Sequence, residues 1–370
     1  MKTYGVIMAG GGGTRFWPLS RAEEPKQLLN LSGKDLMVNE TIDRIATFTD
    51  KQDIFIVTNE TQVPKMRTAT ESRIAADHIL AEPAARNTSA CIGYAALEIV
   101  KKYGDGIMCI FPSDHFIKNQ PEFTRVLKEA IQIAEQEDKL ITLGITPTFP
   151  STGYGYIKFD ATDAAYAKKV VEFKEKPDEE TAKAYVASGE YAWNSGMFIW
   201  RASTILRAFD QLLPDVAACL HEIGDAMGTD VEKETIARVY PNIPSISIDY
   251  GIMEKSSDVL VISAEFGWND VGSWDNLGVL YDADASGNVI AANHIGIDTT
   301  NSIVYGKKRL ITTIGIDNLI VVETDDAILV CDKNRAQDVK KIVDELKKRG
   351  AKSANVSAMN WWDMSGTRYI

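Results

Sequence analysis

The sequence predicts an α/β fold, in which a mixed, mainly parallel sheet flanked by helices is followed by a small β-rich domain. Three observations lead to this prediction. Continuous apolar runs alternate with helical periodicities through the first two-thirds of the chain, short β-rich runs fill the C-terminal part, and DADASG at 282–287 has the composition of a linker. Apolar strands separated by helices are typical of a parallel sheet that is buried on both faces. We therefore expect one domain at 1–281 and a second at 282–370.

The elements of the first 150 residues follow from their apolar periodicity. Helical spacing at 36–48, 87–104 and 121–136 predicts three helices, and Asn87 or Thr88 is the expected N-cap of the second. Because ligands bind beyond the carboxyl ends of parallel strands, the loops after the strands are the expected place for a site. Uninterrupted apolar runs predict these strands at 4–9, 53–58, 78–82, 106–111 and 140–145.

The later elements are less regular. YGYIKF, KKVVEF and YAWNSGMFIW resemble strands, and DEETAKAYVAS resembles a helix that Asp178 caps and Gly189 ends. After the linker, β-rich runs with a turn signal about every ten residues lead to a final amphipathic helix, AQDVKKIVDELKKRG. These runs predict a β-roll or a short β-helix. We find no strict tandem repeat in them, so the choice between the two stays open.

The composition is that of an ordinary globular protein, with 45% hydrophobic and 25% charged residues in a chain of 370. The net charge of −12 argues against binding to nucleic acid or to an anionic membrane, because both need a basic face. The N-terminus lacks the pattern of a signal peptide, and no apolar run approaches the roughly 18 residues of a membrane span, so we expect a cytoplasmic protein. The four scattered cysteines form no CxxC pair and indicate neither a disulfide framework nor a zinc site.

The stretch GGGGTR at 10–15 directly follows the first predicted strand. It does not match a P-loop, because no Lys-Ser or Lys-Thr follows the glycines. It does not match the Rossmann fingerprint either, because the third glycine would fall on Arg15 or Phe16. The remaining interpretation is a glycine loop whose backbone N–H groups surround a triphosphate, with Arg15 and Lys26 balancing its charge. We favour this interpretation over a tight turn beside two surface cations.

The longer stretch GGGGTRFWPLSRAEEPKQLL closely resembles the signature of the sugar-nucleotide pyrophosphorylases, the nucleotidyltransferases of sugar 1-phosphates. Its extended form is most like that of the mannose-1-phosphate guanylyltransferases. The resemblance covers about 1–280, through EPAARNT, FPSDHFI, GYGYI, EKP, WNSGMF and WNDVGSW in the same order. The departures are mild: Gly12 stands where the family often has serine, Phe16 where it often has leucine, and FPSDH replaces LPADH. None of them removes a charged group.

This resemblance implies a Rossmann-like fold of the nucleotide-diphospho-sugar transferase type. It also implies the reaction of GTP with mannose 1-phosphate to give GDP-mannose and diphosphate, without a general base, because the attacking phosphate oxygen is already anionic. Mg²⁺ is the implied cofactor, with Asp114 and Asp270 as its ligands. Asp114 follows an apolar strand, which by itself predicts a carboxylate at the carboxyl edge of the sheet. The implied catalytic residues are Arg15, Lys26, Asp114 and Asp270.

The same resemblance assigns residues to each substrate. Glu175 is expected to bind a hexose hydroxyl and Lys176 the sugar phosphate, whereas Asn87 can equally be a helix cap and His115 is expected to be structural. The residues implied for the nucleotide are Ala9, Gly10, Gly11, Gly12, Gly13, Thr14, Arg15, Lys26, Glu82, Pro83, Arg86, Asn87, Ser113 and Asp114. Those implied for the sugar phosphate are Gly153, Tyr154, Glu175, Lys176 and Asn194.

Two alternatives stay open. The same chemistry can serve another sugar 1-phosphate or another nucleotide, because base choice depends on a few loop hydrogen bonds. An inert sugar-nucleotide sensor or regulatory subunit on the same fold is the other alternative, although it would be expected to have lost some of the four catalytic residues. We further expect a homodimer. We expect no phosphomannose isomerase activity, because 370 residues leave no room for the cupin-type domain of some bifunctional relatives.

Overall fold

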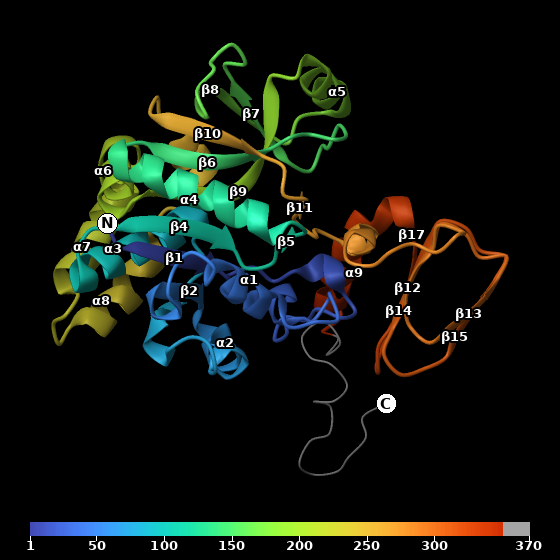
Figure 1. Cartoon of the computed structure of the whole chain (residues 1–370). Coiled ribbons are helices and arrows are strands. Elements are labelled where there is room, and N and C mark those ends of the chain that lie inside the picture. The colour runs from blue at the N-terminus through green and yellow to red at the C-terminus, as the bar shows by residue number, and fades with distance from the viewer. Residues whose placement is uncertain (351–370) are drawn as a thin grey trace, which may run out of the picture. The chain divides into compact units, whose positions relative to one another are not determined.

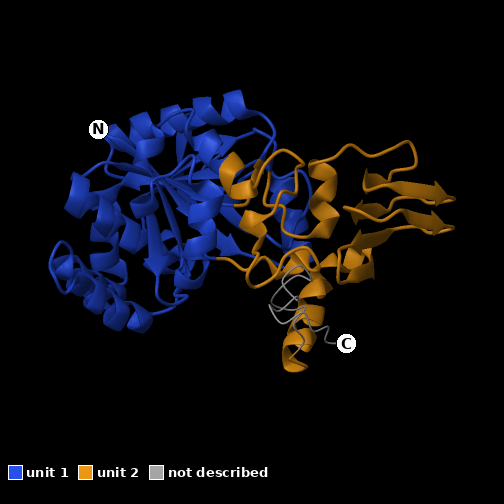
Figure 2. Cartoon of the chain, turned by 90° about the horizontal axis from the view of Figure 1, so that it is seen from below, with its two compact units in different colours: residues 1–10, 41–113, 117–268 blue, residues 11–40, 114–116, 269–370 orange. Residues whose placement is uncertain are grey.

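The computed structural model describes residues 1–350, which form two compact units (Figure 2). Unit 1 consists of Met1–Gly10, Thr41–Ser113 and Ile117–Trp268. Unit 2 consists of Gly11–Glu40, Asp114–Phe116 and the described residues from Asn269 onward. The chain passes between the units after Gly10, after Ser113, and inside α1 Met37–Ile45, β5 Phe116–Ile117 and β11 Trp268–Asn269. The predicted domains 1–281 and 282–370 are defined by sequence pattern, and their boundary stays a prediction.

Unit 1 is built on a nine-stranded sheet with the strand order β3-β2-β1-β4-β9-β6-β10-β8-β7 (Figure 1). β8 and β9 run against the other seven strands, so the predicted mixed, mainly parallel sheet is confirmed. The order reverses beside β1, which pairs with β2 on one side and with β4 on the other. The strands are β1 Thr3–Met8, β2 Ile54–Asn59, β3 Ile79–Glu82, β4 Ile107–Pro112, β6 Leu140–Ile145, β7 Gly155–Phe159, β8 Ala167–Glu175, β9 Tyr191–Arg201 and β10 Val259–Ala264.

Helices cover both faces of this sheet. On one face, Val6 of β1 and Ile110 of β4 are buried in a core that includes residues of α3, α6 and α7. On the other face, α4 packs across β4, β6 and β9, and the rings of Phe111 and Phe123 lie 6.0 Å apart (Figure 1). The helices are α2 Val63–Thr70, α3 Asn87–Tyr103, α4 Gln120–Gln136, α5 Glu179–Ser188, α6 Ala202–Leu212, α7 Pro214–Ala226, α8 Glu232–Val239 and the π-helix η7 Asp249–Met253.

The helix starts test the predicted caps. Asp178 caps α5 as expected, because its side chain accepts a hydrogen bond from the Thr181 N–H, and Gly189 ends the helix. The predicted N-cap of α3 is wrong, because Arg86 occupies that position. Asn87 has a left-handed φ of 66°, and the Thr88 hydroxyl instead accepts a hydrogen bond from the Ile248 N–H at 2.8 Å. The Thr88 hydroxyl therefore accepts a hydrogen bond from a residue distant in the sequence and does not cap its own helix.

In the described part of unit 2, the five short strands β12 to β16 alternate between two sheets, which is the arrangement of a short β-helix. β12, β14 and β16 pair in parallel in one sheet, with β17 antiparallel at its edge, and β13 pairs in parallel with β15 in the other. This decides between the β-roll and the β-helix in favour of the latter. The strands are β12 Val289–Ala291, β13 His294–Ile297, β14 Ile303–Gly306, β15 Ile311–Ile314, β16 Leu319–Glu323 and β17 Ile328–Asp332. The helical elements are η1 Thr14–Phe16, η2 Lys26–Leu28, η8 Trp274–Val279, η9 Lys333–Asp338 and α9 Val339–Lys348.

The core of unit 2 joins the N-terminal loop to the C-terminal strands. The ring of Trp274 lies 5.1 Å from that of Phe16 and 5.3 Å from that of Tyr305. The indole N–H of Trp274 also donates a hydrogen bond to the carbonyl of Trp17 at 3.0 Å. All four aromatic side chains are nearly or fully buried. The segment that follows the four glycines thus shares its core with the β-helix.

Candidate functional site

The first group of predicted site residues lies where the strand order of the unit 1 sheet reverses. Ala9 and Gly10 directly follow β1, and Ser113 directly follows the neighbouring β4. The Ser113 N–H donates to the carbonyl of Met8 at 3.1 Å, so the two strand ends are held side by side. In open α/β sheets this reversal is where ligands bind beyond the strands.

Glu82 ends β3 and lies next to this group. A Cβ built onto Gly10 would lie 3.2 Å from one Glu82 carboxylate oxygen, and the other accepts a hydrogen bond from the Tyr240 hydroxyl at 2.6 Å. Burial raises the pKa of Glu82, although the hydrogen bond from Tyr240 opposes this shift. Pro83 and Arg86 follow Glu82 in the loop before α3, and Asn87 is the first residue of α3.

The second group gathers around Lys26 in unit 2. The ammonium of Lys26 donates to a carboxylate oxygen of Asp114 at 2.8 Å, to the Asp114 carbonyl at 3.0 Å and to the Asp270 carbonyl at 2.7 Å. Lys26 is only 4% exposed, so these three oxygens replace the water that a buried ammonium would lose. Burial alone would raise the pKa of Asp114, but the charges of Lys26 and His115 outweigh it and keep this pKa below its ordinary value.

The glycine loop is fitted to Lys26 at one position. Gly13 has a φ of 57°, and a Cβ added there would lie 2.3 Å from the Cβ of Lys26, so both backbone conformation and space require glycine. A Cβ on Gly11 or Gly12 would meet no protein atom within 4 Å. The Gly11 carbonyl accepts a hydrogen bond from the Gln27 side chain at 3.1 Å, which connects the loop to the residue after Lys26. Contacts within the protein therefore explain Gly13 but leave Gly11 and Gly12 unexplained.

Asp270 is positioned by a strained turn. The next residue, Val271, is buried and has a φ of 45°, which is uncommon for a β-branched residue. Its N–H donates to the side chain of Asn269 at 2.7 Å, and the Gly272 N–H donates to that of Asn276 at 3.0 Å. A Cβ on Gly272 would lie 2.8 Å from an Asp270 carboxylate oxygen. These side-chain contacts hold the turn and thereby fix the position of Asp270.

Arg15, in η1 after Thr14, is bound by a residue far along the chain. Its guanidinium donates to the side-chain oxygen of Gln337 in η9 at 2.8 Å, and the Gln337 amide donates to the Ser273 hydroxyl at 2.7 Å. Ser273 in turn bonds to the Asp275 carboxylate. A chain of hydrogen bonds within unit 2 thus sets the direction of the arginine.

The third group contains most of the predicted sugar-phosphate residues and lies in unit 1. Glu175 ends β8 opposite Gly155, where an added Cβ would lie 2.5 Å from its carboxylate and 3.4 Å from the Cβ of Asn194. Lys176 pairs with the Glu175 carboxylate at 2.6 Å and has a strained φ of 47°. Its N–H donates to the carbonyl of Tyr154 at 3.2 Å. The exposed Gly153 lies apart from this group: it donates its own N–H to the Ser151 hydroxyl, and a Cβ added to it would meet only this hydroxyl within 4 Å.

Sequence reasoning missed three residues that belong to these groups. Gly155 was inside the quoted motif GYGYI, and its position opposite Glu175 could have drawn attention to it. Asp249 accepts a hydrogen bond from the Asn194 amide at 2.8 Å, and Gln337 holds Arg15. Neither Asp249 nor Gln337 stands in a motif that we quoted, and no spacing pointed to them.

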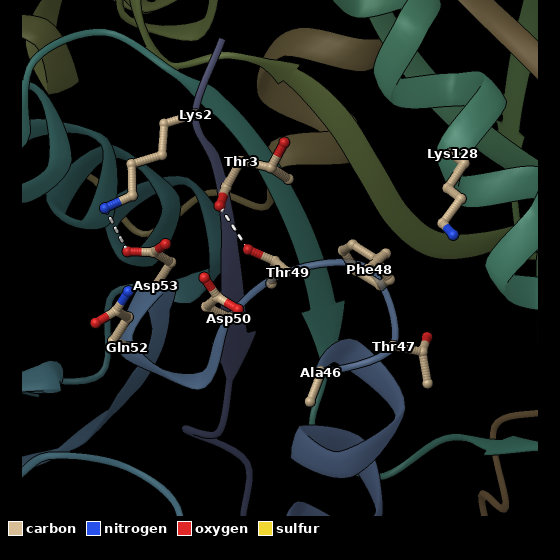
Figure 3. Close-up of a pocket in the computed structure, with 10 residues that line it drawn as sticks. All are labelled: Lys2, Thr3, Ala46, Thr47, Phe48, Thr49, Asp50, Gln52, Asp53 and Lys128. Atoms are coloured by element: carbon tan, nitrogen blue, oxygen red, sulfur yellow. Dashed lines mark hydrogen bonds and ion pairs between the residues drawn. The ribbon is translucent and has the colours of Figure 1, made fainter.

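A groove at the amino end of β1, opposite the carboxyl ends of the strands, contains none of these residues. It has a volume of about 560 Å³ and is lined by Lys2 and Thr3 at the start of β1, by Lys128 and by residues between 46 and 53 after α1 (Figure 3). Lys2 pairs with Asp53 at 2.7 Å within it. Because ligands of such sheets bind beyond the carboxyl ends of the strands, we do not regard this groove as the active site.

Two features are absent from residues 1–350. This part of the chain contains no group of three or more His, Cys, Asp or Glu side chains placed to hold a metal ion. No helix in this part of the chain combines the length and the apolar character needed to cross a membrane.

Comparison with known proteins matches both parts of the chain. The nucleotidyl transferase family model matches residues 4–286, and that of the MannoseP isomerase/GMP-like beta-helix domain matches residues 292–346. The chain is 42% identical over 354 residues to the xanthan biosynthesis protein XanB of Xanthomonas campestris pv. campestris strain B100, covering 94% of this chain and 74% of that protein. It is 39% identical over 365 residues to mannose-1-phosphate guanylyltransferase of Escherichia coli K12, with the same two coverages. A crystal structure described as mannose-1-phosphate geranyltransferase from Thermus thermophilus superposes with a TM-score of 0.84 at 31% identity, covering 94% of this chain and all of that one.

Proposed function

Because the chain belongs to the nucleotidyl transferase family, we propose that it catalyses the reaction of GTP with α-D-mannose 1-phosphate to give GDP-mannose and diphosphate. The similarity to a protein named mannose-1-phosphate guanylyltransferase over 94% of the chain supports this choice of substrates. The observation that carries the proposal is the buried Lys26, whose ammonium bonds to both Asp114 and Asp270 next to the glycine loop. This set combines the cation, the carboxylates and the open backbone that transfer between two polyanions needs.

In the proposed reaction, an oxygen of the sugar phosphate forms a bond to the α-phosphorus of GTP. The bond from that phosphorus to the bridging oxygen of the β-phosphate breaks, and its electron pair leaves with diphosphate. No proton has to be removed from the attacking oxygen, so the residues act by alignment and charge. Arg15 and Lys26 bind the triphosphate and stabilise the charge that develops on the leaving group. Gly11 and Gly12 let the phosphates approach the backbone.

The acidic residues fit magnesium as the metal. Mg²⁺ in phosphoryl-transfer sites is commonly bound by one or two protein carboxylates and completes its shell with water and phosphate oxygens. Asp114 and Asp270 would provide this donor set, and the lowered pKa of Asp114 keeps its carboxylate ionised, as a metal ligand must be. When bound, the metal supplies positive charge that offsets the charge of the phosphate oxygens.

The residues of unit 1 are proposed to bind the rest of each substrate. Glu175 and Asn194 bind sugar hydroxyls, and Lys176 binds the phosphate of the sugar. Glu82, Pro83, Arg86 and Asn87 are proposed to contact the nucleoside, together with Ala9, Gly10 and Ser113 at the strand ends. Gly153 and Tyr154 complete the sugar site. The homodimer and the cytoplasmic location also stay predictions.

A substrate panel tests the proposal. The purified protein with Mg²⁺ is given each of several nucleoside triphosphates with each of several sugar 1-phosphates, and diphosphate release is measured. We expect GTP with mannose 1-phosphate to give the highest kcat/KM. A higher value for another pair would replace the substrates and keep the mechanism. No release with any pair would favour the sensor or regulatory subunit.

A further inference from the structure

Asp249, the first residue of η7, lies against the proposed sugar residues. One of its carboxylate oxygens accepts a hydrogen bond from the side-chain amide of Asn194 at 2.8 Å. The amide oxygen of Asn194 accepts in turn from the Gly196 N–H at 3.1 Å. Since both ends of the amide are bound, Asn194 is fixed in one orientation, with its nitrogen toward Asp249. The second Asp249 oxygen takes no part in this contact.

The negative charge of Asp249 is only partly compensated by its surroundings. Among the described residues Asp249 forms no ion pair, and the nearby Lys176 is paired with Glu175. Burial raises the pKa of Asp249 to about 6, and the negative charge of Glu175 adds to the shift. Two carboxylates beside one lysine favour the uncharged hydroxyls of a ligand, which donate hydrogen bonds, and leave the lysine for a phosphate group.

Aromatic side chains adjoin the same group. Tyr154 lies one residue before Gly155, and its ring is 5.0 Å from that of Trp193 and 5.1 Å from that of Trp268. Both tryptophan side chains are largely buried. An aromatic ring beside a few fixed hydrogen-bonding groups is typical of sites for small polar molecules, and a pyranose ring has both an apolar face and a rim of hydroxyls.

We propose that Asp249 is a sugar-binding residue whose carboxylate accepts a hydrogen bond from a hydroxyl of the hexose 1-phosphate, while it fixes the amide of Asn194. This inference rests on the proposed function and deepens it, because it names a recognition group for the sugar that the sequence motifs do not contain. The Asp249 carboxylate and that of Glu175 then bind different hydroxyls of the same ring. Each hydroxyl donates a hydrogen bond to one carboxylate, and the partly exposed ring of Tyr154 contacts the carbon face.

The test combines enzyme variants with altered substrates. Asp249→Asn has the same shape and can keep the contact to Asn194 through its amide oxygen, but it removes the charge. Glu254→Gln is the matched control, because Glu254 is exposed, lies at the end of the same π-helix, and removes a charge that also acts on Glu175. Wild type and both variants are assayed with mannose 1-phosphate and with its 2-, 3-, 4- and 6-deoxy analogues, each at saturating GTP.

For Asp249→Asn we expect kcat/KM for mannose 1-phosphate to fall about 10- to 100-fold, mainly through KM, because a hydrogen bond to a charged group is lost. The KM for GTP should change less than about twofold, and Glu254→Gln should match wild type in both constants. One deoxy analogue should lose a similar factor with wild type and almost nothing further with Asp249→Asn, because the same contact cannot be removed twice.

Equal losses for all analogues in wild type and variant would overturn the inference, since they would show no coupling between Asp249 and any hydroxyl. A comparable loss in Glu254→Gln would overturn it as well, because the effect would then be one of general charge. If wild type prefers another sugar 1-phosphate, the proposed substrate is wrong, but the same cycle with deoxy analogues of that sugar still tests Asp249.

Discussion

Two lysine–carboxylate pairs have the same chemistry and opposite surroundings. The side chain of Lys26 is 5% exposed and has three oxygen acceptors, whereas that of Lys176 is 61% exposed and pairs with Glu175 alone. Lys26 follows Pro25 in a short helix with relaxed dihedral angles, whereas Lys176 has a left-handed backbone. The buried pair is fixed by its neighbours, and the exposed pair is fixed by little besides its own backbone.

The difference indicates how each lysine can meet a ligand. A buried ammonium whose donors are already bound has its position set before substrate arrives, which is the condition for electrostatic stabilisation of a transition state. An exposed ion pair contributes about 0–1 kcal/mol to stability, so its lysine can exchange the carboxylate for a phosphate at small loss. We therefore expect changes at Lys26 to affect both folding and turnover, and changes at Lys176 to affect sugar-phosphate binding alone.

Lys26→Met is expected to have the largest effect. It leaves Asp114 and the Asp270 carbonyl without their common donor, so we expect a loss of about 1–3 kcal/mol in the free energy of unfolding. We also expect kcat to fall by about 10²–10³ or more, because the cation that we propose stabilises the charge on the triphosphate is removed. Urea unfolding and steady-state kinetics measure the two effects. Lys176→Met is the control for stability and should unfold within about 0.5 kcal/mol of wild type.

Asp270→Asn should affect turnover without a comparable effect on nucleotide binding. We expect kcat to fall about 10²-fold and the Mg²⁺ concentration for half-maximal rate to rise, because a ligand charge is lost. The Kd for GTP without metal, measured by calorimetry, should change less than about threefold. Because Lys26 bonds to the Asp270 carbonyl, its position is kept in this variant. Unchanged turnover at low Mg²⁺ would refute the metal-binding role.

Lys176→Ala should act on one substrate. We expect KM for mannose 1-phosphate to rise about 10- to 30-fold, as for the loss of one charged hydrogen bond, and KM for GTP to stay within about twofold. Product formation is followed at saturating levels of the other substrate. The reverse ranking of the two KM values would assign Lys176 to the nucleotide and break the comparison with Lys26.

Asp249→Asn should remove a dependence of stability on pH that the wild type has. The pKa of Asp249 in the folded protein is about 6, above its ordinary 3.8, so the folded state binds this proton more tightly than the unfolded state. The stability of wild type therefore decreases as the pH rises from about 4 through 6, and an asparagine avoids this decrease. The stability advantage of the variant should grow by about 1 kcal/mol between pH 5 and pH 8 in urea unfolding. An advantage that is constant with pH would contradict the raised pKa.

Gln337→Leu is expected to have the smallest effect. The hydrogen bond from Arg15 to Gln337 is exposed, and its loss leaves the arginine charge in place. We expect KM for GTP to rise about three- to tenfold, as for one neutral hydrogen bond, with little change in KM for the sugar phosphate. Gln337→Glu keeps the acceptor and should stay near wild type. An unchanged KM for GTP in Gln337→Leu would show that Arg15 acts equally well without its hydrogen bond to Gln337.

The fold was largely predictable because its signals are local. Apolar runs gave the strands of the sheet within one or two residues, as for 140–145, and Asp178 and Gly189 marked α5. The β-helix could not be told from a β-roll, because the alternation of strands between two sheets depends on pairings that leave no strict repeat. The cap of α3 was missed because Ile248, which lies 160 residues from Thr88, competes for its hydroxyl.

The candidate site, like the fold, was predictable only where its signals are local. Lys26, Asp114 and Asp270 stand in motifs beside apolar strands or tryptophans, so their grouping could be foreseen, although their roles stay predictions. Asp249 and Gln337 could not be found, because their partners lie 55 and 322 residues away. The contact between Asp249 and Asn194 forms only when β9 and η7 pack together. No residue type or spacing near Asp249 in the sequence predicts it.

The shared core of the N-terminal loop and the β-helix has a consequence for synthesis on the ribosome. Trp274 emerges 257 residues after Trp17, to whose carbonyl it bonds. At translation rates of about 5–20 residues per second, the segment after the glycines waits roughly 10–50 s for this partner. During that time its aromatic side chains lack their final neighbours, so this segment should be among the last parts of the nascent enzyme to mature.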